Sequence, residues 1–141
     1  MSQSIIYNDP DTGNLCIEVL AEGADIERAV ETLVPAGVPY EILFPRDIPQ
    51  DRTFRDSWEH DLTTGPNKIA ANVDKAKLVA HEVRRQKRDE AFKPLDVQAT
   101  IPFLANKAEA ERAIIRTEDA TKQSSIDAAS TIEELKVIIN G

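Results

Sequence analysis

The stretch VDKAKLVAHEVRRQKRDEAF, Val73–Phe92, is the longest uninterrupted helical pattern in the chain. Asn72 can cap its first turn, and the basic residues gathered toward its other end suit the helix dipole. Pro94 predicts where the helix ends, because the residue before a proline is pushed out of the helical region. Its apolar stripe is thin and made mostly of small side chains: Val73, Ala76, Ala80, Val83 and Ala91. A helix that buries so little needs a partner, either the next helix or another copy of the chain.

A second helix and a short terminal helix are expected to follow. Pro102 cannot lie deep inside a helix without a kink, so the pattern predicts a short helical piece near 96–101 and a longer helix over 102–122. The segment Thr131–Glu134, TIEE, has the form of a capping box and predicts a last amphipathic helix. The second half of the chain is therefore interpreted as a helical hairpin followed by a short terminal helix.

The first part of the chain alternates short apolar runs with turn residues. Residues 4–8, 15–20 and 38–44 are predicted to be strands, and residues 25–34 a short amphipathic helix. Pro39 favours an edge position for the third strand, because proline has no backbone N–H to donate. The order β-β-α-β predicts a three-stranded antiparallel sheet with one helix across a face, so the fold class is expected to be α+β.

A loop with one or two helical turns is expected after the third strand. In turns around 53–60, Phe54 and Trp58 would share a helical face and pin this segment onto the sheet. The stretch TTGPNK, 63–68, is rich in residues that interrupt regular structure and predicts a linker. The expected division is a small acidic α+β domain over 1–62, a linker over 63–72 and a helical hairpin domain over 73–141.

The charge of the chain is unevenly divided. The whole sequence has a formal net charge of −8, and residues 1–66 hold 4 basic and 13 acidic side chains. An acidic first half argues against nucleic-acid binding there, because phosphate contacts dominate that affinity. No apolar run approaches the roughly 20 residues that span a bilayer. The first residues do not resemble a signal peptide, so no membrane partner is expected.

No pattern of catalytic or metal-binding residues is found. His60 lies between two acids, but a polar helix end is favoured over a metal site or an acid–base pair. His81 has no histidine four residues away, and Cys16, the only cysteine, is expected to be a buried inert thiol. The basic run Arg84–Arg88 is the best nucleic-acid candidate, yet its neighbouring acids favour helix-end electrostatics and intermolecular ion pairs. We expect no enzyme activity, no cofactor and no metal.

Three stretches carry a family resemblance: YNDPDTGNL at 7–15, VPAGVPYEI at 34–42 and DIPQDRTFRDSW at 47–58. Together they resemble a group of small proteins encoded by tailed bacteriophages and prophages, often beside the tail-fibre genes. The helical segments of those relatives have counterparts here at Asp74–Lys77, Leu95–Val97 and Glu133–Lys136. The resemblance therefore spans nearly the whole chain, and it brings no catalytic residue with it.

The resemblance implies a structural or interaction protein of the virion tail or tail-fibre attachment region. Its N-terminal domain would dock on other phage tail or tail-fibre proteins, and its helices would self-associate, with a trimer favoured by fibre symmetry. The alternative is a tail-fibre assembly chaperone that is absent from the mature virion. The expected location is the virion, or the host cytoplasm during phage assembly. The candidate interaction residues are Leu78, Val79, Ala80, Val83, Ile114 and Ile115.

Overall fold

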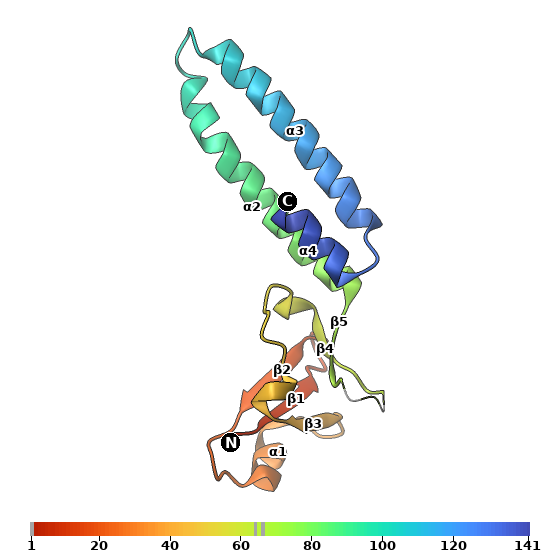
Figure 1. Ribbon diagram of the computed structural model, residues 1–141. Coiled ribbons are helices and arrows are strands. Elements are labelled where there is room, and N and C mark those ends of the chain that lie inside the picture. The colour runs from red at the N-terminus through yellow and green to blue at the C-terminus, as the bar shows by residue number, and fades with distance from the viewer. Residues whose placement is uncertain (1, 64, 66) are drawn as a thin grey trace. The chain divides into compact units, whose positions relative to one another are not determined.

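The computed structural model describes residues 2–63, 65 and 67–141 (Figure 1). It has the mixed α+β class expected from the sequence, with a small antiparallel sheet and a short helix followed by long helices. The chain divides into two compact units, Met1–Lys75 and Ala76–Gly141. Among the described residues, no helix is long and apolar enough to cross a membrane.

The first unit is built on an antiparallel sheet with the strand order β2-β1-β3. Its elements are β1 Ser4–Asn8, β2 Leu15–Val19, α1 Ile26–Leu33 and β3 Tyr40–Leu43. The predicted order β-β-α-β is confirmed, and β3 is an edge strand, as the nearby Pro39 predicted. Gly13, with φ +73°, closes the turn between β1 and β2 in a conformation that favours glycine.

Alternating side chains of β1 bury both faces of this sheet. Ile5 and Tyr7 lie in one cluster, which the apolar side of α1 covers. Ile6 lies in a second cluster on the other face, together with Leu43 and Trp58. Because neighbouring residues of a strand point to opposite faces, the central strand contributes to both clusters and holds the unit together.

A second, two-stranded sheet follows β3. The short 3-10 turns η1, Pro45–Asp47, and η2, Arg55–Ser57, lead into strand β4, Trp58–His60. Strand β4 pairs antiparallel with β5, Ile69–Ala71. The helical turns predicted around 53–60 are therefore wrong from Trp58 onward.

Burial with a period of two explains why this segment is a strand. Trp58 and His60 are buried, and Glu59 between them is half-buried. Phe54 and Trp58 thus do not share a helical face, although both side chains are buried, at 2% and 4% exposure. Trp58 packs against Ile6 and fastens the segment to the main sheet, as expected.

The expected linker over 63–72 is wrong in its last part, because residues 69–71 form β5. Two residues of the predicted linker motif, Thr64 and Pro66, lie outside the described residues. The Asn72 side chain accepts a hydrogen bond from the Lys75 backbone N–H at 3.2 Å and donates one to Glu59 at 2.8 Å. The start of the long helix is thereby fixed to β4, and the first unit extends to Lys75 instead of ending at residue 62.

The long helix α2, Val73–Gln98, runs through Pro94, so the predicted end near Phe92 is wrong. A proline inside a helix removes one backbone hydrogen bond and crowds the carbonyl four residues before it, and here Leu95 is buried directly after the proline. The packing of that side chain favours continuation of the helix. The segment expected as a separate short piece is therefore partly the end of α2 and partly the turn after it.

Helices α3, Ala105–Ala128, and α4, Ile132–Asn140, complete the second unit. The first begins after Pro102 and extends beyond the predicted end at residue 122. The Thr131 side chain accepts a hydrogen bond from the Glu134 backbone N–H at 3.2 Å, which confirms the predicted cap of α4. The buried apolar residues of this unit are few, and half of them are alanines: Ala76, Ala80, Leu95, Ala108, Ile126, Ala129, Leu135 and Ile139.

Candidate interaction surface and its supporting ion-pair cluster

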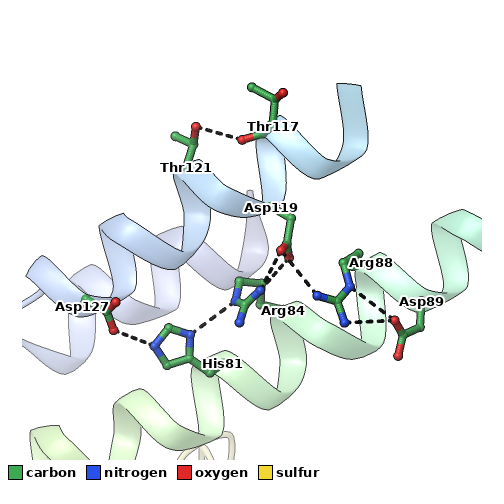
Figure 2. Close-up of polar contacts among 8 residues, drawn as sticks. All are labelled: His81, Arg84, Arg88, Asp89, Thr117, Asp119, Thr121 and Asp127. Carbon is green, nitrogen blue, oxygen red and sulfur yellow. Dashed lines mark hydrogen bonds and ion pairs between the residues drawn. The ribbon is translucent and has the colours of Figure 1, made fainter. Parts of the chain in front are cut away.

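A buried ion pair joins α2 to α3 (Figure 2). The Nη1 atom of Arg84 lies 2.8 Å from both carboxylate oxygens of Asp119. The Arg84 side chain is only 5% exposed and that of Asp119 only 13%. Charge-assisted hydrogen bonds of this length are about twice as strong as neutral ones. This pair is therefore the strongest polar contact described between the two helices.

Further polar contacts extend the pair along both helices. Arg84 Nε donates to His81 Nδ1 at 3.3 Å, and His81 Nε2 lies 2.7 Å from Asp127 Oδ1. Because an arginine Nε can only donate, His81 accepts at Nδ1 and carries its proton on Nε2, which donates to Asp127. Arg88 Nη1 lies 3.6 Å from Asp119, and Figure 2 shows the chain of contacts running across the two helices.

Three lysines tie the second unit together by donating to backbone oxygens. Lys77 donates to the carbonyl oxygen of Asp127 at 2.9 Å. Lys87 donates to the carbonyl oxygen of Ile139, and Lys122 to that of Gly141 at 3.0 Å. Cations at the last carbonyls of a helix are stabilised by its dipole. The C-terminal end of α4 is thus held by one lysine from α2 and one from α3.

The predicted interaction residues fall into three classes of exposure. Leu78 is 70% exposed and Ile114 is 57% exposed, so both are open to a partner. Half-buried residues form the second class: Val79, Val83 and Ile115. Ala80 is completely buried inside the unit, so its assignment to an interaction surface is wrong. Ala80 follows Ala76 by one turn and belongs to the internal stripe of α2.

The outer side of α3 is an uncharged stripe. Its residues are all exposed and follow each other at alternating spacings of four and three: Ala110, Ile114, Thr117, Thr121, Ser124 and Ala128. The hydroxyl of Thr117 donates to the Ala113 carbonyl, and that of Thr121 donates to the Thr117 carbonyl, each at 3.1 Å. Because these hydroxyls are satisfied within the helix, the stripe behaves as a less polar surface than its composition suggests.

The basic run Arg84–Arg88 does not lie at a helix end, because α2 continues to Gln98. The expected helix-end role is therefore wrong, and the ion pairs that the structure shows are within the chain. Arg84 and Arg88 contact Asp119, and Arg85 lies 3.6 Å from Glu82. The spacing of Arg84 indicates its burial: it follows Ala76 and Ala80 at intervals of four, so it lies on the buried stripe and needs an acidic partner.

Other side chains that could bind a metal or take part in a reaction are separate from this cluster. Within the described residues, no three His, Cys, Asp or Glu side chains gather closely enough to hold a metal ion. His60 is buried in β4, and its Nδ1 has no hydrogen-bond partner in the described part of the chain. Burial, with a smaller contribution from Cys16, raises the pKa of Tyr7, and the Cys16 thiol is half-buried. These groups belong to the sheet, and none lies in the helical unit.

No protein-family model, curated protein or solved structure matches the chain. The function is therefore inferred from the residues themselves and from the resemblance of the three N-terminal stretches. What the helical unit offers is a polar cluster on the inside and exposed apolar side chains on the outside. Such an arrangement suits association between proteins.

Proposed function

We propose that this protein is a structural or interaction protein of a bacteriophage tail or tail-fibre attachment region. The first unit would dock on another tail or tail-fibre protein, and the helical unit would self-associate. The resemblance of residues 7–15, 34–42 and 47–58 to small phage proteins supports the phage assignment. These three stretches cover the end of β1 with the turn into β2, the segment from the end of α1 into β3, and the approach to β4, so all three lie in the first unit.

The observation that carries the proposal is the set of large apolar side chains exposed on the helical unit. Leu78, Ile114 and Val137 are 70%, 57% and 74% exposed, on α2, α3 and α4 respectively. Single exposed apolar residues are common on protein surfaces, whereas contiguous apolar patches mark interfaces; we propose that these three residues contribute to such a patch. Half of the buried apolar residues of this unit are alanines, so association would add to a small apolar core.

The stripe on α3 has the spacing of a coiled-coil seam. Positions repeating at four and three residues keep one side of a helix facing a partner helix. The small side chains Ala110, Thr117 and Ser124 would allow that partner to approach closely. Self-association through this seam would give a closed cyclic oligomer, and a trimer matches the symmetry of fibres.

A tail-fibre assembly chaperone is the second candidate. Phe103, in the turn between α2 and α3, is 86% exposed, more than any other large apolar residue that the structure describes. An exposed aromatic residue on a turn suits transient contact with a folding partner, and it is not needed for a permanent helical seam. The acidic net charge of −8 would keep such a binder soluble.

Mass spectrometry of purified phage particles separates the two candidates. A virion component is present in fixed proportion to the tail proteins. A chaperone is absent from particles, yet it is recovered with the tail-fibre protein from infected cells before assembly is complete. If the chain is found neither in particles nor with any tail or tail-fibre protein, both forms of the proposal fail.

A further inference from the structure

A small hollow lies between α2 and α3, beside the buried ion pair. Its volume is about 120 Å³, and four cationic side chains line it: Arg84, Lys87, Arg88 and Lys122. Two acidic side chains, Glu118 and Asp119, lie at the same hollow. The lining therefore carries two more positive than negative side chains.

The bonding of Arg84 leaves two donors open. An arginine has five N–H donors, and the contacts of Arg84 use its Nε and Nη1 atoms. Its Nη2 atom has no partner, and it is not among the buried unpaired atoms of the described residues. Although the side chain is 95% buried, Nη2 is therefore not sealed from solvent, and Arg84 is one of the residues that line the hollow.

Among the described residues, neither Lys87 nor Lys122 forms an ion pair with a side-chain carboxylate. Lys87 and Lys122 donate only to the backbone oxygens at the end of α4. Asp119 already has both oxygens on Arg84, and it lies 3.6 Å from Arg88. The excess of positive charge thus stays available to an incoming anion.

We propose that this hollow binds the carboxylate of an acidic side chain from a partner protein. This inference rests on the proposed function, because it names what the helical unit recognises on its partner. A carboxylate accepts from an arginine and a lysine at once, and such charge-assisted bonds are short and strong. Ala91 and Ile115 form an apolar part of the lining, which matches the methylene groups of a glutamate better than an inorganic phosphate.

Acetate and its neutral isostere acetamide test the proposal on the isolated full chain. Each is titrated at constant ionic strength, made up with chloride, while backbone amide NMR signals are followed. We expect acetate to cause saturable shifts at 84–91 and 115–122, and acetamide to cause none. Inorganic phosphate in a parallel titration is expected to bind more weakly than acetate.

Three variants at two lysines of α3 locate the site. Lys122→Gln is expected to weaken acetate binding at least fivefold, and Lys122→Arg to restore most of it. Lys107→Gln, on the same helix and outside the hollow, is expected to leave acetate binding unchanged. Unshifted signals of Leu135 and Ile139 in Lys122→Gln show that α4 remains packed.

The proposal is overturned if acetate shifts do not saturate, if acetamide acts equally, or if Lys122→Gln and Lys107→Gln behave alike. Tighter binding of phosphate would overturn the carboxylate assignment. These measurements need no phage protein, so their failure would leave the particle mass spectrometry untouched. Absence from phage material, in turn, would not alter the acetate titration.

Discussion

Replacing Asp119 by Asn leaves the buried guanidinium of Arg84 without its counter-charge. The change keeps the size of the side chain but removes the carboxylate that accepts two hydrogen bonds at 2.8 Å. We expect this substitution to destabilise the helical unit more than any substitution of an exposed ion pair. The reason is that a charged group that is hardly exposed cannot recover its hydration when its partner is lost.

The expected loss of stability in Asp119→Asn follows from two considerations. Removal of one partner of a buried pair costs about 3–5 kcal/mol. Arg84 lines the hollow and its Nη2 atom is not sealed from solvent, so the lower end, about 3 kcal/mol, is expected. This is a large fraction of the total stability of a small unit, which is typically about 5–15 kcal/mol for a whole domain.

Urea unfolding at pH 7 can follow the two units separately. Far-UV circular dichroism reports mainly on the long helices, and the fluorescence of Trp58, the only tryptophan, reports on the first unit. Asp119→Asn should lower the midpoint of the dichroism transition and leave the fluorescence transition unchanged. Glu109→Gln removes an exposed ion pair with Arg116 and should change neither transition measurably.

A double variant gives the decisive comparison. Arg84→Met with Asp119→Leu removes both charges, and it should recover most of the stability lost in Asp119→Asn. The reasoning is refuted if Asp119→Asn costs less than about 1 kcal/mol, the value of a surface ion pair. It is also refuted if the double variant is less stable than Asp119→Asn.

Three further predictions concern the first unit and the basic run. Trp58→Ala should destabilise the first unit by about 3–5 kcal/mol in urea unfolding, and the native fluorescence maximum of Trp58 should be that of a buried indole; a maximum typical of full water exposure would contradict this. The hydrogen bond from Asn72, together with Lys75, lowers the pKa of Glu59, so its contribution to stability is full above its unfolded pKa and lost as the pH falls through the folded value. The loss of stability of the first unit at acidic pH should therefore be smaller in Glu59→Gln than in the wild type. If the free energy of unfolding depends on pH identically in both proteins, the stabilising role of the Glu59 carboxylate is refuted. The run Arg84–Arg88 should show no sub-micromolar binding of DNA or RNA at low salt in a filter assay; binding that is lost in a quadruple alanine variant would overturn this.

The elements that local signals define were predictable from the sequence. The strand Ser4–Asn8 has the predicted bounds, and Thr131 caps the terminal helix as its motif indicated. Strand β5, Ile69–Ala71, was not predictable in the same way. Three residues carry too weak a pattern, and β5 exists because it pairs with β4 across a hairpin.

The course of α2 and the ion-pair cluster show a second limit of prediction from the sequence. Pro94 is a strong local signal for a helix end, yet packing of Leu95 outweighs the one lost hydrogen bond. Arg84 could be placed on the buried stripe of α2 by its spacing, but its partner Asp119 lies 35 residues away on another helix. The spacing that predicts a buried charge cannot by itself select which acid neutralises it.

Sedimentation equilibrium of the wild-type chain and of Leu78→Asp with Ile114→Asp measures whether the helical unit mediates self-association. Both residues are exposed, so the paired substitution should not disturb the interior of the helical unit. At tens of micromolar, the wild type is expected to be an oligomer, with a trimer favoured, and the double variant a monomer with unchanged Trp58 fluorescence. A wild-type chain that is monomeric at these concentrations, and that binds no phage tail or tail-fibre protein, would contradict association through the helical unit.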